Sequence, residues 1–286
     1  MVRRTRSRLG RGGVCLLVLG GAGYASAQSA APPAPERPYG LPLRGAEAEV
    51  FLRTAEVTKT KALSVGVTHS EQLTLSDGTR TLKAVRKTID ERDHGVKSLE
   101  GGGFAVDFVD SWKYEVAAYE LNKLLDLELV PPTIERRLSG KDGSLQMWVE
   151  GVMTEWDRMK GHLRPPDPEQ WNRQIHTIRL LHALTYNTDF RNLRNELVDP
   201  EFRVYAIDFT RAFRVQGFIA TEKDLQRFPR APLERMRALE ATSLTDALGR
   251  WLTGPEIGGL LERRDRILAL VAKRIKEKGE AAVLFP

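Results

Sequence analysis

YNTDFRNLRNELVD, residues 186–199, is the stretch that most constrains the fold and function of this 286-residue chain. It is polar, follows a long amphipathic segment and precedes an apolar run. A polar loop between a helix and a strand is where functional groups concentrate on a rigid scaffold. The next run, YAIDFTRAF at 205–213, places Asp208 directly after apolar strand residues. Asp189, Asn195 and Asp208 are therefore candidates for one site.

Upstream of this stretch, the sequence predicts a β-hairpin. Apolar runs at 72–76 and 79–89 flank Asp77-Gly78, and an Asp-Gly pair between extended runs is a strong turn signal. The polar segment 92–103 ends in three glycines and is predicted to be a loop. A further extended piece is predicted at 144–149, between two glycines.

Apolar residues at helical spacing predict the helices. The first helix is expected to begin with Asp110 as N-cap and to run to about Asp126. The second begins at Asp167-Pro168, an N-cap followed by a first-turn proline. Helical stripes continue from 222 to 282. The breaks between these stripes fall at Pro229, Pro232 and Gly254-Pro255. Strands dominate early and helices late, which predicts an α+β fold with two lobes.

The N-terminus has the features of a secretory signal peptide. Five arginines precede an apolar run at 14–22, and Ala25-Ser-Ala27 forms a small-residue cleavage pattern. The run is shorter than the roughly 20 residues of a membrane span, so an uncleaved anchor is the less favoured alternative. We predict a signal peptide at 1–27, export to a periplasm, a secretory lumen or the medium, and no transmembrane span after cleavage. Residues 28–45, rich in alanine and proline, are predicted to be a flexible linker.

Charge and cysteine content exclude several classes of function. Of the 44 Lys and Arg residues, five lie in the predicted signal peptide, so 39 face 38 acidic residues after cleavage. Such a balance argues against nucleic-acid binding. The single cysteine, Cys15, also lies in the signal, which excludes disulfides and thiolate catalysis in the cleaved chain. Neither a G-x-S-x-G nor an H-E-x-x-H motif is present, which disfavours a hydrolase.

Phosphoryl transfer fits the residues that remain. It needs a lysine on the phosphates, a glutamate that orients the lysine, a carboxylate at the attacking hydroxyl, and Asp and Asn ligands for the metal. Lys87 ends the strand run AVRK, similar to the V-A-I-K pattern of kinases, and strand alternation places Val85 on the same face. Lys83 shares that face and is an alternative.

Two glutamates of the first predicted helix compete for the role of lysine partner. Glu115 flanks the apolar stripe, which favours it over Glu120 as the buried partner of Lys87.

Four segments carry a resemblance to a known family. EVAAYELNKLLDLELVPPT (115–133), GSLQMWV, YNTD with the following N and LVD, and YAIDFTRAF resemble the atypical kinase-like proteins that include the secretory-pathway (Golgi) casein and sugar kinases. HipA and the phosphatidylinositol kinases are more distantly similar. The resemblance spans about residues 61 to 214, and the C-terminal helices resemble uncharacterised bacterial members. It implies a bilobal kinase fold, with a small β-rich N-lobe with one key helix at 46–149 and a larger helical C-lobe at 150–286.

The resemblance also implies the roles of individual residues. Lys87 would contact phosphate and pair with Glu115, and Asp189 would be the catalytic carboxylate. Asn195 and Asp208 would bind Mg²⁺ or Mn²⁺ beside ATP.

Further residues are expected to support this site. Arg191 and Arg211 match family arginines that brace the catalytic loop. Val85 would lie beneath the adenine. Gly66 is the remaining candidate for phosphate cover, because no G-x-G-x-x-G motif precedes Lys87.

The chain departs from the family pattern inside the catalytic loop. Phe190 is an inserted residue, so Asn195 follows Asp189 by six positions rather than five, and Asn192 becomes a rival metal ligand. Arg194 stands where a small residue is usual. Three functions therefore remain open. The first is an exported ATP-dependent phosphotransferase acting on a hydroxyl of a protein, sugar or lipid head group, and the second is a catalytically inactive pseudokinase that serves as a binding or scaffold module in the cell envelope. The third is a purely structural exported protein that retains the fold alone.

Overall fold

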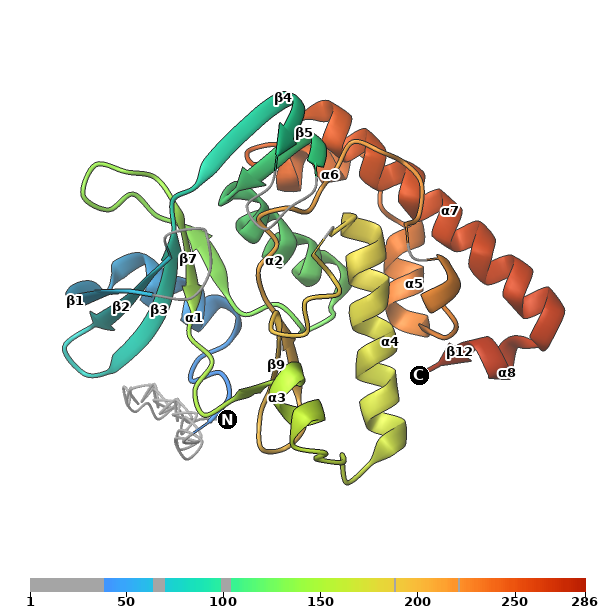
Figure 1. The fold of residues 1–286 in the computed structure, drawn as a ribbon, viewed down its shortest axis with the longest axis horizontal. Helices are drawn as coiled ribbons and strands as arrows, with labels where there is room; N and C mark the ends of the chain where they lie inside the picture. The colour runs from blue at the N-terminus through green and yellow to red at the C-terminus, as the bar shows by residue number, and fades with distance from the viewer. Residues whose placement is uncertain (1–38, 64–69, 99–103, 188, 221) are drawn as a thin grey trace, which may run out of the picture. The chain divides into compact units, whose positions relative to one another are not determined.

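The fold combines a β-sheet N-terminal region with a mostly helical C-terminal part (Figure 1). The computed structural model describes residues 39–63, 70–98, 104–187, 189–220 and 222–286. The predicted signal peptide and residues 28–38 of the predicted linker lie outside this part of the chain. Leu43 is buried, so the last residues of that linker pack into the folded body.

Five antiparallel strands form the main sheet, in the order β1-β2-β3-β7-β6. The strands are β1 (Glu56–Ala62), β2 (Glu71–Ser76), β3 (Thr81–Lys87), β6 (Thr133–Glu135) and β7 (Ser144–Met147). The predicted hairpin is confirmed: β2 pairs with β3, and Asp77 Oδ1 closes the turn by accepting from the amides of Thr79 and Arg80 at 2.9 and 2.7 Å. Helix α1 (Gly45–Thr54), which the sequence analysis did not predict, packs against this sheet.

The segment predicted to be a loop at 92–103 is largely β-strand. β4 (Asp90–Ser98) and β5 (Phe104–Ser111) pair antiparallel as a separate two-stranded sheet. The described side chains of β4 are exposed or half-buried, so no alternation of apolar and polar residues marked the strand. Asp110 belongs to β5 and is not the predicted N-cap. Helix α2 (Lys113–Leu125) begins later, with Trp112 at the N-cap position.

The remaining elements follow in chain order. They are β8 (Met153–Thr154), α3 (Glu155–Lys160), α4 (Pro168–Thr185), β9 (Glu196–Val198), β10 (Val204–Ala206), the 3-10 turn η1 (Glu222–Asp224), β11 (Phe228–Pro229), α5 (Arg230–Arg237), α6 (Ala241–Leu248), α7 (Gly254–Lys278), α8 (Glu280–Val283) and β12 (Leu284–Phe285). α4 begins as predicted, because Asp167 Oδ1 accepts from the amides of Glu169 and Gln170. Pro232 lies in the first turn of α5, where a proline needs no amide donor, and so does not break the helix.

Two apolar clusters form the interior. The smaller joins α1 to the main sheet through Phe51, Leu52, Leu73 and Leu75. The larger holds most buried residues of α2 together with those of α4 to α7, and α2 also contacts β6 and β7 (Figure 1). α2 therefore lies between sheet and helices, which places its first turn near both parts.

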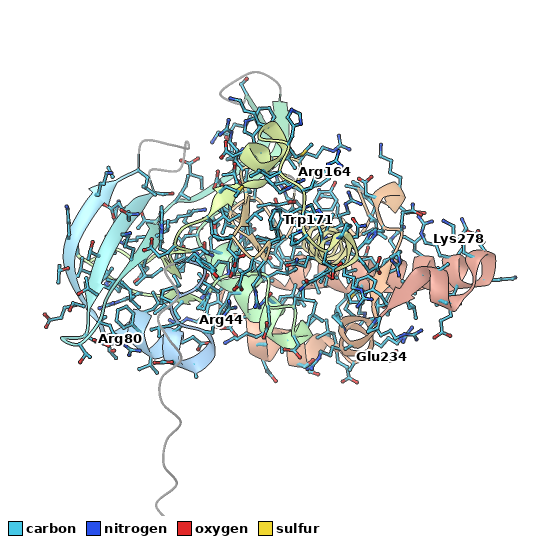
Figure 2. The ribbon with its side chains drawn as sticks, turned by 90° about the horizontal axis from the view of Figure 1, so that it is seen from below. Arg44, Arg80, Arg164, Trp171, Glu234 and Lys278 are labelled. Carbon is cyan, nitrogen blue, oxygen red and sulfur yellow. The ribbon has the colours of Figure 1, made fainter. Side chains whose placement is uncertain are left out.

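Charged side chains occupy the outside of this body. Figure 2 shows Arg80, Glu234 and Lys278 at its periphery, whereas Trp171 is buried in the helical part. In the parts of the chain that the structure covers, none of the helices has the length and apolarity required to cross a bilayer.

Candidate functional site

Three charged side chains from distant parts of the sequence meet where the main sheet approaches the helices. Lys87 Nζ lies 2.5 Å from Glu115 Oε1 and 2.7 Å from Asp208 Oδ1. The side chains of Lys87 and Glu115 are only 12% and 2% exposed, while that of Asp208 is 32% exposed. We call these three residues the ion cluster. Asp208 is the residue of the ion cluster that solvent reaches most.

The local structure explains why these side chains converge. Lys87 is the last residue of β3, Glu115 lies in the first turn of α2, and Asp208 follows β10. Asp208 has a left-handed backbone with φ of 64°, a conformation that non-glycine residues adopt mainly at special sites. The turn brings the next amide, Phe209 N, within 3.1 Å of Glu115 Oε1. Glu115 thus binds both the lysine and the backbone beside Asp208.

The electrostatics of the ion cluster follow from its burial. Burial alone would raise the pKa of Asp208, but the charge of Lys87 and its hydrogen bonds outweigh burial and hold the pKa below its usual value. Burial lowers the pKa of Lys87. The charges of Asp208 and Glu115 raise it by more, so that the pKa lies above its usual value. Burial raises the pKa of Glu115, despite Lys87. Two carboxylates share one ammonium, so the arrangement favours an additional cation.

The rival residues of the sequence analysis lie elsewhere. Lys83 pairs with Glu150 at 2.9 Å, and Glu120 pairs with Lys123 at 3.0 Å, both on the surface. Neither joins the ion cluster. The structure brings Lys87, Glu115 and Asp208 together and leaves out Lys83 and Glu120. Apolar patterning in the sequence had favoured Glu115 over Glu120.

Asp189 lies in a loop held by amide side chains. Tyr186 caps the C-terminus of α4, and its left-handed backbone (φ 50°) turns the chain out of the helix. Asn187 Oδ1 accepts from Asp189 N at 3.0 Å. The Nδ2 groups of Asn192 and Asn195 donate to Asp189 Oδ2 at 3.2 and 3.0 Å. Neutral hydrogen bonds therefore position this carboxylate.

The two asparagines differ in their free oxygen atoms. Asn192 Oδ1 accepts a hydrogen bond from Arg194 N at 3.3 Å. In the described chain, the side chain of Asn195 makes its hydrogen bond through Nδ2, and no donor contacts its Oδ1. The backbone of Asn195 also accepts from Ile207 N at 2.9 Å, next to Asp208. Amide and carboxylate oxygens suit Mg²⁺ or Mn²⁺, so the Oδ1 without a described donor favours Asn195 over Asn192 as the metal ligand.

His182 lies beneath the loop and links it to the segment after Asp208. It is buried, its ring stacks on Phe209 with centroids 5.6 Å apart, and its Nδ1 lies 3.3 Å from Asn187 Nδ2. Burial lowers the pKa of His182 to about 4, so the imidazole is neutral at pH 7. His182 was not among the residues predicted for the site.

The inserted Phe190 is accommodated on the α4 side of the loop. Its ring centroid lies 6.5 Å from that of His182, and the Arg191 guanidinium lies 5.2 Å from its own. Both residues line a cavity of about 560 Å³ between α3, α4 and the loop. Arg194 is exposed, with its guanidinium 5.5 Å from the Trp156 ring centroid. The side chains of Phe190 and Arg194 make these ring contacts, while the described hydrogen bonds to the Asp189 carboxylate come from Asn192 and Asn195.

The other predicted residues have separate places. Val85 is a half-buried residue of β3, two positions from Lys87. Gly66 lies outside the described residues. Arg191 makes the ring contact above, and Arg211 Nε donates to Asp110 Oδ2 at 2.9 Å, which ties the segment after Asp208 to β5.

Two residues of the site were missed as functional by the sequence analysis. Thr210 donates to Asp208 Oδ1 at 3.3 Å, and its carbonyl accepts from Ser111 N at 2.8 Å. Asn187 fixes the backbone of Asp189. Both lie in quoted motifs two positions from an aspartate, a spacing at which short polar side chains bind nearby backbone or side-chain groups.

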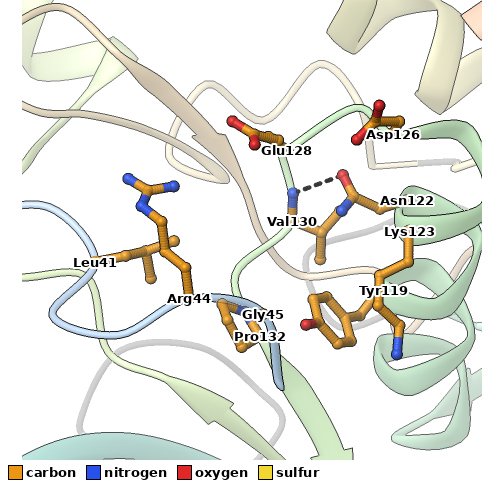
Figure 3. Close-up of a pocket in the computed structure, with 10 residues that line it drawn as sticks. All are labelled: Leu41, Arg44, Gly45, Tyr119, Asn122, Lys123, Asp126, Glu128, Val130 and Pro132. Atoms are coloured by element: carbon orange, nitrogen blue, oxygen red, sulfur yellow. Dashed lines mark hydrogen bonds between the residues drawn. The ribbon is translucent and has the colours of Figure 1, made fainter. Parts of the chain in front are cut away.

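A second cavity lies away from the ion cluster. Its volume is about 230 Å³, and it opens between α1 and the C-terminal half of α2, with Arg44 and Lys123 among its lining residues (Figure 3). Among the described residues, none of the candidates for the site lines this cavity. Within the described ranges, no group of three or more His, Cys, Asp or Glu side chains could hold a metal ion. A metal ion at the ion cluster would therefore rely on Asp208 and an amide oxygen.

Comparison with known proteins gives structural likeness only. No family model and no curated protein match the sequence. The Golgi casein kinase is similar with a TM-score of 0.58 and 14% identity, over 85% of this chain and 79% of the kinase. The Helicobacter pylori proinflammatory kinase CtkA is similar with a TM-score of 0.50 and 10% identity, over 79% of this chain and 98% of that protein. The likeness confirms the predicted α+β, atypical kinase-like fold.

Proposed function

We propose that this chain is a metal-dependent phosphotransferase that moves the γ-phosphoryl group of ATP to a hydroxyl acceptor. The observation that carries the proposal is the ion cluster, in which a buried glutamate holds a lysine against an aspartate that remains accessible. Its structural neighbours are kinases, which supports the same chemical class. Export is part of the proposal and rests on the N-terminal arginines, apolar run and cleavage pattern.

The residues present fit a nucleotide with a divalent metal ion. Hydrogen bonds to the Asp208 carboxylate from the described residues all reach Oδ1, and the Asn195 amide oxygen accepts none. Asp208 and Asn195 would hold the ion, which would neutralise the phosphates. Lys87, oriented by Glu115, would contact phosphate oxygens, and Val85 would line the base pocket.

Asp189 would act at the acceptor. Its carboxylate would orient the acceptor hydroxyl and take its proton as the new O–P bond forms and the bond to ADP breaks. The hydrogen bonds from Asn192 and Asn195 fix the carboxylate in one orientation. The acceptor belongs to the class of hydroxyl compounds in proteins, sugars or lipid head groups.

A binding protein without catalysis is the second candidate. It is favoured by Asp189 Oδ2, which already accepts two amide hydrogen bonds, and by Phe190, which lengthens the loop by one residue. Such a pseudokinase would retain the ion cluster as a nucleotide or partner site and serve as an envelope scaffold.

Thermal unfolding with ligand tests the proposal. ATP with Mg²⁺ or Mn²⁺ should raise the melting temperature, since a hundredfold excess over Kd stabilises the folded state by about 2.7 kcal/mol. The rise should vanish in Asp208→Ala and persist in Asp189→Asn, which should lose phosphoryl transfer to any acceptor or to water. Binding without turnover in the unmodified chain would select the pseudokinase. No rise with either metal rejects the phosphotransferase and leaves a pseudokinase whose ion cluster serves a partner rather than a nucleotide.

A further inference from the structure

Exposed apolar side chains gather on α3 and the turn that follows it. Trp156, Met159 and Leu163 are 47%, 51% and 44% exposed, and they are three of the nine large apolar side chains exposed in the described chain. The chain keeps winding through this turn, because Leu163 N donates to Arg158 O at 3.1 Å. We call the three residues the α3 patch. Single exposed apolar residues are ordinary on a surface, whereas three within eight positions mark a contact surface.

The surroundings of the α3 patch carry an excess of basic side chains. Four basic residues, Arg158, Lys160, Arg164 and Arg194, lie in or beside it, against the two acids Glu155 and Asp157. Arg158 pairs with Glu155 at 2.6 and 2.8 Å, whereas Asp157 accepts from the neutral Thr154 hydroxyl at 2.6 Å and keeps its charge. Three basic residues therefore remain against one carboxylate.

The other basic groups of the patch are available to a partner. Lys160 and Arg164 are exposed, and no ion pair reaches them from the described residues. Figure 2 shows Arg164 on the outside of the molecule. The free charge at the patch is therefore positive.

The composition of the patch matches a lipid surface. A tryptophan with aliphatic neighbours settles at head-group depth, while lysine and arginine reach the phosphates of anionic lipids. Of the three apolar residues, only Met159 lines the neighbouring cavity, so the patch faces outward rather than into a groove that would receive a peptide. We propose that the α3 patch docks this protein peripherally on an anionic lipid surface.

Docking at this patch would also orient the Asp189 loop. Trp156 N donates to Leu193 O at 3.2 Å, and Arg194, which lies over the Trp156 ring, donates its amide to Asn192 Oδ1. The patch is therefore joined directly to the loop that holds Asp189. The lipid contact stands whether or not the site transfers phosphate.

Fluorescence quenching by bromine-labelled acyl chains tests the contact at Trp156 itself. The full chain is mixed with vesicles of brominated phosphatidylcholine, alone or with brominated phosphatidylglycerol. We expect quenching with the anionic vesicles only, and its loss in Trp156→Phe, although four other tryptophans remain. Residues 1–38 are present in every form, and quenching at Trp156 reports the patch rather than that segment. Equal quenching in Trp156→Phe would overturn the proposal.

Charge reversal provides the matched control. Lys160→Glu with Arg164→Glu should weaken vesicle binding measured by this quenching at least about tenfold, since each basic residue near an anionic surface contributes severalfold. Lys59→Glu with Lys61→Glu makes the same change on the exposed strand β1 and should leave the quenching unchanged. Unchanged melting temperatures establish that both double variants fold. Equal effects of the two pairs, or retention on immobilised polyglutamate without vesicle binding, would show that the patch is not a lipid site.

Discussion

The two halves of the candidate site are held together in different ways. In the ion cluster, three charged side chains from β3, α2 and the end of β10 meet with little water around Lys87 and Glu115. In the Asp189 loop, neutral amides from within ten positions of the chain hold one carboxylate. The first arrangement depends on the packing of the whole fold, while the second is local and tolerates the inserted Phe190.

Breaking the ion cluster should have the largest effect. Lys87→Met leaves Glu115 and Asp208 without their shared countercharge and should lower the free energy of unfolding by about 3 kcal/mol. Lys83→Met removes a surface pair with Glu150 and should cost less than about 1 kcal/mol. Urea denaturation of both variants at pH 7 measures the difference. Equal losses would mean that burial adds nothing to the cluster.

Acid should act on the loop half through His182. The unfolded chain binds this proton with a pKa near 6.5 and the folded chain near 4. The stability contributed by the neutral ring is therefore complete above pH 6.5 and is lost as pH falls toward 4. The loss amounts to about 2 kcal/mol by pH 4.5.

The test compares the free energy of unfolding of the unmodified chain with that of His182→Gln across this pH range. Burial and the charge of Glu155 raise the pKa of Glu196 to about 7, so Glu196 changes stability in the opposite direction over an overlapping pH range. The variant retains Glu196, and the stability advantage of the unmodified chain should shrink from pH 6.5 to 4.5. His162→Gln, at an exposed position, should leave the slope unchanged. Parallel pH profiles for the unmodified chain and His182→Gln would contradict a buried neutral ring.

Truncating the asparagines should sharpen the contrast within the loop. Asn192→Ala and Asn195→Ala each remove one hydrogen bond to Asp189, and each should cost about 1 kcal/mol of stability. Only Asn195→Ala should also reduce the Mg²⁺-dependent stabilisation by ATP, because among the described contacts the Asn195 amide oxygen has no donor, whereas that of Asn192 accepts from Arg194 N. Thermal unfolding with and without Mg²⁺-ATP compares the two. The reverse pattern would assign the metal to Asn192.

The smallest effect is expected for Arg194→Ser. The arginine is exposed and contributes a ring contact with Trp156 worth about 0.5 kcal/mol. Stability should fall by no more than that, and ATP-dependent stabilisation should be unchanged. A gain of phosphoryl transfer in this variant would instead identify Arg194 as the feature that silences catalysis.

Several elements were predictable because their signals are local. Asp77-Gly78 closes its hairpin through hydrogen bonds within four residues, and Asp167 caps α4 through the next two amides. Lys87, Asp189 and Asp208 stand at element ends that apolar patterning marks. β4 was missed because its polar residues have no buried face, and Asp110 resembled an N-cap although its strand pairing and Arg211 hold it in β5.

By itself, the sequence determined which chemical groups were present and in what order, namely a lysine after a hairpin strand, a glutamate on the next helix, and the Asp and Asn groups of two motifs. Apolar patterning favoured Glu115 over Glu120, but only the tertiary structure decided which groups meet. Lys83 and Lys87 both belong to β3, yet Lys87 at its end reaches Glu115 and Asp208, whereas Lys83 pairs with Glu150. The preference for Asn195 over Asn192 depends on which amide oxygen is left without a donor. Such choices arise from contacts between residues up to 121 positions apart, which no local pattern encodes.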